Sequence, residues 1–236
     1  MPFSMKTLDF LFENRLHDSR EWFEQHKAEY QKYVIAPMRE LVRELTPAML
    51  QIDKQFTTEP RVDKTICRIW RDTRYSKDKS LYRDTMWIIF KRGKMHGTDY
   101  PGFYFEITGS GYNHGCGFYH ASTGYMDTLR QMILCGDKTF MSALRAFEGQ
   151  SVYHMEGERY KRPHFPDQPE NLRLWLERRN ISFDAHSDDA DLLFSDRLAQ
   201  SLARELMLLR PIYRFLTAAA LQEQQNEAAR AAAAIG

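Results

Sequence analysis

The spacing of the apolar residues changes twice along the chain, and this change constrains the fold more than any other feature of the sequence. Between residues 20 and 45 the apolar side chains recur every three or four positions, which is the period of an amphipathic helix. In the middle of the chain they alternate, as in Phe103–Ile107, which is the period of a strand with one buried face. A helical period returns between residues 198 and 216. The sequence therefore predicts an α+β fold, in which an antiparallel or mixed sheet of four or more strands packs against N- and C-terminal helices.

Turn residues give approximate bounds for the strands. Strands are expected at residues 65–70, 85–91, 102–108 and 112–119. The turn Gly109-Ser110-Gly111 should join the last two strands as an antiparallel hairpin. A second hairpin is expected at Glu156-Gly157-Glu158.

Prolines and caps give approximate bounds for the helices. Asp18 or Ser19 should cap a helix that begins at Arg20, and Pro37 should kink or split this helix. Pro47 fits the first turn of a further short helix, and Pro211 should interrupt the C-terminal helix. Further helices are expected at residues 124–134, 138–147 and 169–179.

The chain shows neither an internal repeat nor a clear linker. Its 236 residues fit one large domain or two small ones, and we expect a single α+β domain at residues 1–221. Residues 222–236 are rich in Ala, Gln and Glu and have no large apolar stripe, so we expect a helical or frayed tail that is dispensable for folding.

Charge and cysteine content limit the class of protein. The formal net charge is only +1, but eleven Lys or Arg and four Asp between Arg61 and Lys94 give that segment +7 and leave −6 for the remainder. The odd count of three cysteines, none of them in a C-x-x-C pair, indicates a reducing cytoplasm. No signal peptide and no membrane span are indicated, because the longest uncharged apolar run has the length of a strand.

The basic segment is the one part of the sequence that predicts a binding site. Arginine grips phosphate or carboxylate in a bidentate fashion, and aromatic rings stack on bases or other rings. The candidate ligand-binding residues are Arg68, Arg71, Arg74, Lys77, Lys79, Tyr75 and Tyr82. Asp72 and Asp78 are the candidate catalytic carboxylates if the protein is an enzyme. The first hypothesis is therefore a domain that binds, or acts on, a phosphorylated or other anionic small molecule.

Two other functions fit the same residues. The Arg and Asp side chains of the loop could form a structural salt-bridge network, or could dock an acidic partner, which makes the protein an interaction module. The local charge of +7 with its aromatics also fits nucleic-acid binding. The sequence does not separate these alternatives and gives no oligomeric state.

A metal or cofactor site is not expected. His114, Cys116 and His120 share one side of a strand, but His114 and His120 would lie about 20 Å apart at about 3.3 Å per residue. Zinc ligands lie about 2.0–2.3 Å from the metal, so a straight strand cannot bring both histidines to one ion. Dinucleotide-binding, P-loop and nucleophile-elbow motifs are absent.

The chain resembles a widespread, mainly bacterial family of uncharacterised proteins that is catalogued as a domain of unknown function. The family hallmark is R-I-x-R-D-x-R-[FY]-S-x-D-K-x-x-Y, which stands here as Arg68–Tyr82. The N-terminal pattern of the family is matched by Phe10-Leu11, Arg20-Glu21-Trp22-Phe23 and Tyr30, and its Gly-rich hairpin is similar to Gly102–Gly117.

This resemblance extends to about Leu216, with two departures. Leu81 stands where members often carry Pro, and Cys116–His120 replaces a Gly-Gly followed by Trp and Pro. The resemblance implies a complete, single-domain chain. It implies no established activity.

Overall fold

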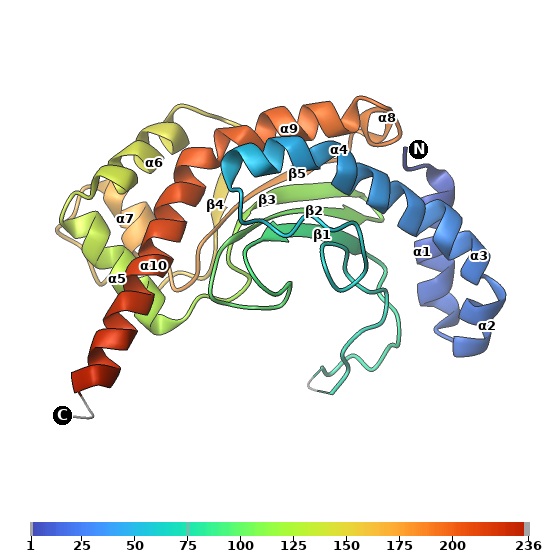
Figure 1. Ribbon diagram of the computed structural model, residues 1–236, viewed down its shortest axis with the longest axis horizontal. Coiled ribbons are helices and arrows are strands. Elements are labelled where there is room, and N and C mark those ends of the chain that lie inside the picture. The colour runs from blue at the N-terminus through green and yellow to red at the C-terminus, as the bar shows by residue number, and fades with distance from the viewer. Residues whose placement is uncertain (1, 75, 234–236) are drawn as a thin grey trace. The chain divides into compact units, whose positions relative to one another are not determined.

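The computed structural model describes residues 2–74 and 76–233. In chain order its helices and strands are α1 (Met5–His17), α2 (Arg20–Gln25), α3 (Lys27–Glu29), the π-helix η1 (Tyr30–Ile35), α4 (Ala36–Ile52), β1 (Met86–Lys91), β2 (Gly102–Thr108), β3 (Gly111–Gly117), α5 (Thr123–Leu134), α6 (Lys138–Glu148), β4 (His154–Glu156), α7 (Glu170–Leu176), β5 (Ser182–Ser187), α8 (Ala190–Leu193), α9 (Leu198–Leu208) and α10 (Arg210–Ala233) (Figure 1). No helix among these residues is long and apolar enough to cross a membrane.

The five strands form one antiparallel sheet in the order β1-β2-β3-β5-β4. The tight turn at Gly109-Ser110 joins β2 to β3, which confirms the predicted hairpin. Helices from both ends of the chain pack with the sheet, so the predicted α+β class is confirmed.

By its contacts the chain divides into two compact units. The first unit comprises the chain up to residue 95 together with residues 103–114 and 186–207. The second comprises residues 96–102 and 115–185 and the chain from residue 208 onward.

In the first unit, α4 packs against α9 and against β1. The residues of β2 alternate between buried and half-buried, and Phe103, Phe105 and Ile107 are fully buried. This is the alternation expected from the sequence, and it leaves Tyr104 and Glu106 on the other face of the strand.

In the second unit, α10 packs against α6 and α5. Aromatic rings fill this core, where Trp175 contacts Phe140 at 5.4 Å and Phe183 at 5.2 Å between ring centroids. The helix α10 continues through the segment expected to be a tail. Glu223 is buried there and accepts hydrogen bonds from Thr128 Oγ1 of α5 at 2.6 Å and from Arg230 Nη2 at 2.7 Å. The division at residue 221 stays a prediction.

Two expected β elements are wrong. Residues 65–70 form only isolated bridges, from Ile66 to Val62 and Ile88 and from Trp70 to Tyr82, because the chain leaves the edge of β1 after Cys67. The turn at Glu156-Gly157-Glu158 starts no local hairpin. The strand β4 pairs with β5, and Arg178 from the later segment donates to the carbonyls of Met155 at 2.8 Å and Gly157 at 2.6 Å.

The prolines act as expected at two of three positions. Pro37 lies in the first turn of α4 directly after the π-helix η1, so the regular helix is interrupted there. Pro211 lies in the first turn of α10, after α9 has ended. Pro47 is the exception, because α4 runs through it to Ile52. It lies on the exposed side of a helix whose other side is held by buried Leu45 and Met49.

Candidate functional site

The Arg-rich loop is closed at its neck by backbone hydrogen bonds. The Arg71 amide donates to the Leu81 carbonyl at 2.8 Å, and the Arg83 amide donates to the Ile69 carbonyl at 2.9 Å. Between these bonds Tyr82 is fully buried, with its ring 4.3 Å from that of Trp70 and 5.1 Å from that of Phe23 in α2. The predicted ligand-binding residue Tyr82 therefore lies in the core.

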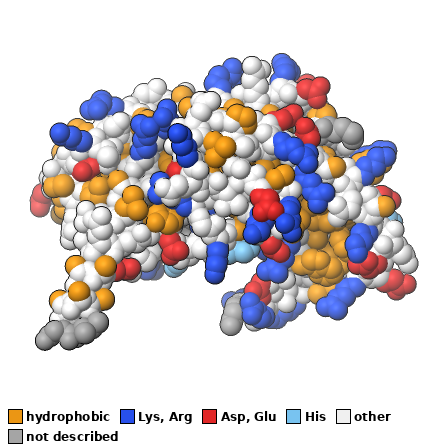
Figure 2. Space-filling view, viewed as in Figure 1, with side chains coloured by type: hydrophobic (Ala, Val, Ile, Leu, Met, Phe, Trp, Pro, Cys, Tyr) orange, Lys and Arg blue, Asp and Glu red, His pale blue; other side chains and the backbone are white. Residues whose placement is uncertain are grey.

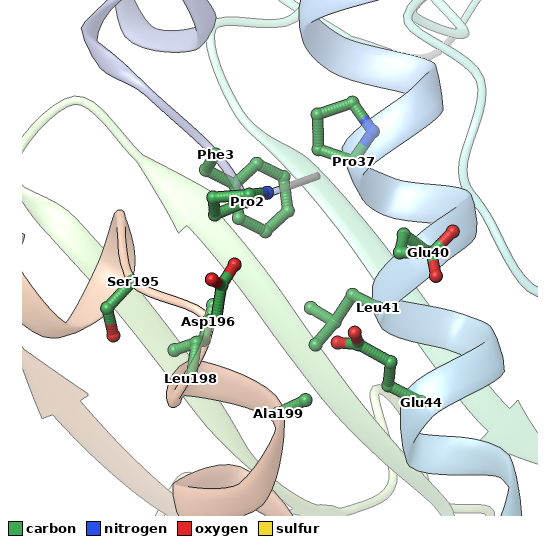
Figure 3. Close-up of a pocket in the computed structure, with 10 residues that line it drawn as sticks. All are labelled: Pro2, Phe3, Pro37, Glu40, Leu41, Glu44, Ser195, Asp196, Leu198 and Ala199. Carbon is green, nitrogen blue, oxygen red and sulfur yellow. The ribbon is translucent and has the colours of Figure 1, made fainter.

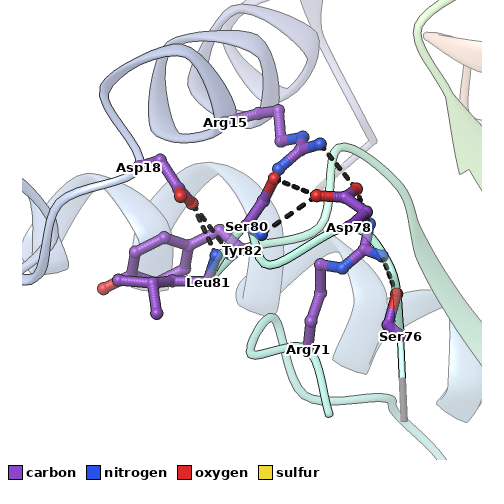
Figure 4. Close-up of polar contacts among 8 residues, drawn as sticks. All are labelled: Arg15, Asp18, Arg71, Ser76, Asp78, Ser80, Leu81 and Tyr82. Carbon is purple, nitrogen blue, oxygen red and sulfur yellow. Dashed lines mark hydrogen bonds and ion pairs between the residues drawn. The ribbon is translucent and has the colours of Figure 1, made fainter. Parts of the chain in front are cut away.

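Asp18, at the C-terminal end of α1, forms hydrogen bonds with this neck. It caps that helix with a left-handed backbone, at φ 45°. Its Oδ1 accepts hydrogen bonds from the amides of Leu81 at 2.7 Å and Tyr82 at 3.2 Å (Figure 4). Leu81 stands where the family resemblance expects Pro, and a proline at this position would have no amide to donate.

Arg15 and Arg71 converge on one carboxylate of the loop. Arg15 Nη2 and Arg71 Nη1 each lie 2.9 Å from Asp78 Oδ2, and Arg71 Nη2 also donates to Ser76 Oγ at 3.4 Å (Figure 4). The other oxygen of Asp78 accepts from the amide and hydroxyl of Ser80. These Ser80 bonds and then the two arginines lower the pKa of Asp78 to about 2. Asp78 is therefore ionised at neutral pH.

The two guanidinium groups keep unused donors and remain accessible. Their side chains are 28% and 24% exposed, and Asp78 is 43% exposed. A guanidinium offers five N–H donors. Among the described residues, the Nε atoms of Arg15 and Arg71 and Nη1 of Arg15 make no hydrogen bond. The cluster of two cations and one carboxylate carries a net charge of +1, so it is able to accept an anion.

The remaining candidate residues do not join this cluster. Arg74 pairs with Asp72, through Nε at 3.0 Å and Nη2 at 2.7 Å, and these bonds hold the pKa of the Asp72 carboxyl well below its usual range. Arg68 lies 3.7 Å from Asp63. Asp72 thus pairs with its neighbouring arginine within the loop.

The lysines of the loop are exposed. Lys79 Nζ donates to the Thr73 carbonyl at 2.8 Å, whereas Lys77 makes no hydrogen bond or ion pair within the described part of the chain. Figure 2 shows Lys and Arg side chains toward the tip of the loop, with Asp and Glu side chains among them. Tyr75 lies outside the described residues.

Sequence reasoning missed Arg15 and Asp18 as members of the site. Each contacts a loop residue 63 positions later, and no local spacing or motif signals such a contact.

The residues that were weighed as metal ligands have different surroundings. His114 is 2% exposed, and its Nε2 lies 3.1 Å from Glu205 Oε2 of α9. Burial lowers the pKa of His114 to about 4, so the ring is neutral at pH 7 and this contact is a hydrogen bond rather than an ion pair. Cys116 is fully buried, which raises the pKa of its thiol, whereas His120 is exposed. Within residues 2–74 and 76–233, no three His, Cys, Asp or Glu side chains are grouped to hold a metal ion.

Two hollows in the first unit are lined by other residues. One lies between α4 and the start of α9, and three of its lining residues are Glu40, Glu44 and Asp196 (Figure 3). Burial and then the neighbouring carboxylates raise the pKa of Glu44. The three carboxyl groups give this hollow an acidic lining, which does not suit an anion. The other, of about 590 Å³, is bordered by Trp22 and Tyr33 among others. Neither of these two hollows includes Arg15 or Arg71.

Comparison with known protein families identifies the family of this chain. A family model described as "Conserved hypothetical protein (DUF2461)" matches residues 6–215. The chain matches no curated protein and no solved structure. The family match agrees with the resemblance seen in the sequence. It does not test the hallmark motif, which stays a prediction.

Proposed function

The chain belongs to the DUF2461 family of conserved hypothetical proteins, and for this member we propose, from the geometry of its loop, that it binds a phosphate-like anion through Arg15 and Arg71. One observation carries the proposal. Asp78 holds the guanidinium groups of two distant segments together, while unused N–H donors on both remain accessible. A pair of guanidinium forks is a common receptor for phosphate and carboxylate groups. The exposed Lys77 and Lys79 add positive charge beside the pair.

Binding fits this cluster better than catalysis. A general acid or base works best when its pKa lies near the working pH. The pKa of Asp78 is lowered to about 2, and Arg74 holds the pKa of Asp72 well below its usual range, so neither carboxylate carries a transferable proton at pH 7. We therefore propose an anion-binding domain, with Asp78 as the group that positions the two arginines.

A structural role for the same loop is the second candidate. Three carboxylates, those of Asp63, Asp72 and Asp78, each pair with an arginine within or beside the loop. On this alternative the arginines hold the loop in place and bind no ligand. Nucleic-acid binding through the basic segment is a third candidate. The cytoplasmic location that the cysteine content indicates also stays a prediction.

Thermal-shift measurements separate these candidates. The panel contains inorganic phosphate, sulfate, nucleotides, sugar phosphates, small carboxylates and a single-stranded oligonucleotide. A ligand at about 100 times its dissociation constant adds about 2.7 kcal/mol of stability, which is roughly 5–10 °C for a chain of this size. We expect at least one phosphate-bearing compound to raise the melting temperature. A shift with the oligonucleotide alone would favour the nucleic-acid candidate.

Substitution of Asp78 by Asn distinguishes the site from a structural network. The Asn side chain keeps an oxygen for Ser80 but turns an NH₂ group toward Arg15 and Arg71, so it no longer holds the two guanidinium groups together. Anion binding should therefore weaken in this variant. Arg71→Gln should abolish the shift, and Arg61→Gln, on a 69% exposed side chain of the same basic segment, should not. If instead no anion stabilises the wild type and both Asp78→Asn and Arg71→Gln lower its melting temperature, the loop is a structural network.

A further inference from the structure

The sheet face opposite α4 carries a chain of polar side chains in the first unit. Along β2 the odd-numbered residues are buried, whereas Tyr104, Glu106 and Thr108 are half-exposed. Asn113 of β3 is likewise half-exposed, and His186 of β5 is exposed. The strands β2, β3 and β5 are neighbours in the sheet (Figure 1). These polar residues therefore lie on three adjacent strands.

Hydrogen bonds link three of these side chains in a fixed direction. Asn113 Nδ2 lies 3.1 Å from Glu106 Oε2, and His186 Nδ1 lies 2.8 Å from Asn113 Oδ1. An ionised carboxylate only accepts, so Asn113 must turn its NH₂ group toward Glu106 and its oxygen toward His186. Because that oxygen also only accepts, His186 Nδ1 must carry the hydrogen. In the neutral ring Nε2 is then left with its lone pair, on an exposed side chain.

A close approach of the backbones places Asn113 beside His186. Gly111 at the start of β3 has φ 141°, and a Cβ atom added there would lie 2.2 Å from the carbonyl oxygen of Ser187 at the end of β5. Only glycine allows the two strands to approach this closely. The close approach of β3 and β5 at Gly111 therefore sets the distance between the Asn113 and His186 side chains.

We propose that His186 is the acid–base group of a second ligand site on this open sheet face, independent of the arginine pair. The site would take a hydroxyl-bearing ligand, because His186 Nε2 and the second oxygen of Glu106 both accept hydrogen bonds and neither donates. The ligand O–H donates to Nε2 and, in a reaction, passes its proton there while the oxygen keeps the electron pair. Asn113 and, through it, the charge of Glu106 stabilise the resulting imidazolium. Asn113 and Glu106 are positioning residues in this arrangement.

Nitrogen-15 NMR of the histidine rings tests the arrangement directly. In the wild type at a pH where the ring is neutral, we expect His186 to be the tautomer with hydrogen on Nδ1. Asn113→Ala should replace that single tautomer by a mixture. Glu106→Gln should do the same without loss of side-chain volume, because Gln no longer fixes the direction of the Asn113 amide, and it serves if Asn113→Ala fails to fold. His154, exposed on β4, is the internal control whose tautomer should not change in either variant. Hydrogen on Nε2 of His186 in the wild type would overturn the proposal.

Ligand titrations in the same spectra test the site. Glucose and glycerol are the hydroxyl probes, with tetramethylammonium chloride and sodium acetate as probes that lack a hydroxyl. We expect the hydroxyl probes alone to shift the Nε2 resonance of His186 saturably, and to slow its modification by diethyl pyrocarbonate relative to that of His154. If no hydroxyl probe shifts this resonance, or if acetate and tetramethylammonium shift it equally, His186 is an ordinary surface histidine.

Discussion

Acidification should destabilise this protein through one buried histidine. Burial lowers the pKa of His114 to about 4 in the folded chain, whereas an unfolded chain titrates near the usual 6.5. Between these values the unfolded chain binds a proton that the folded chain does not, so stability is present above pH 6.5 and is lost as the pH falls toward 4. The full difference corresponds to about 3 kcal/mol, of which about 2 kcal/mol should be lost between pH 7 and pH 4.5.

Urea denaturation at these two pH values measures the effect. His114→Gln keeps a donor for Glu205 but removes the titration, so its stability should fall by about 2 kcal/mol less than that of the wild type over the same pH range. Substitution of the exposed His120 by Gln is the matched control and should leave the pH dependence unchanged. The reasoning is refuted if wild type and His114→Gln lose equal stability, because Glu205 would then be stabilising a protonated ring.

Three further substitutions test separate parts of the packing. Gly111→Ala should lower the free energy of unfolding by at least about 1–3 kcal/mol through backbone strain alone, whereas Gly109→Ala, with nothing within 4 Å of the added carbon, should be nearly neutral in chemical denaturation. Glu223→Ala should cost about 1–3 kcal/mol, because the buried Thr128 hydroxyl loses its acceptor and keeps only the hydrogen bond that it accepts from Asn226. Truncation after residue 221 should cost at least as much. The exposed Glu227→Ala is the control, and equal melting temperatures would show that the tail is dispensable. Tyr82→Phe removes a buried hydroxyl that has no partner among the described residues, so the variant should be as stable as the wild type or up to about 1 kcal/mol more stable, and a clear loss would reveal a bound water or ligand.

The features that were predicted correctly are those that nearby residues determine. The β2–β3 hairpin follows from alternating apolar residues and a glycine turn only two residues long. Pro37 and Pro211 interrupt helices because a proline acts on its own turn. Pro47 shows the limit of this rule, since its effect depends on tertiary burial elsewhere on α4.

The features that were missed depend on distant partners. Residues 65–70 have the composition of a strand, but most of the segment has no neighbouring strand to pair with. The chain does not reverse at Gly157, because Glu158 and Arg159 continue past β4 and pair with Arg178 and Arg179 of the segment that leads into β5. In the candidate site the loop arginines were predicted, whereas Arg15 and Asp18 were not, since α1 and the loop are far apart in the sequence.

The contacts of Asp18 with Leu81 and Tyr82 also indicate when Arg15 and Arg71 come together during folding. Arg15 and Asp18 both contact residues 63 positions later, and closing a loop of that length costs about 4 kcal/mol of chain entropy. During synthesis the N-terminal helix emerges first, so Arg15 and Asp18 form these contacts only after the loop has been synthesised. The two arginines are then brought together only by a chain that has completed the first 82 residues and buried Tyr82. Anion binding at Arg15 and Arg71 would therefore report that the N-terminal part of the protein has finished folding.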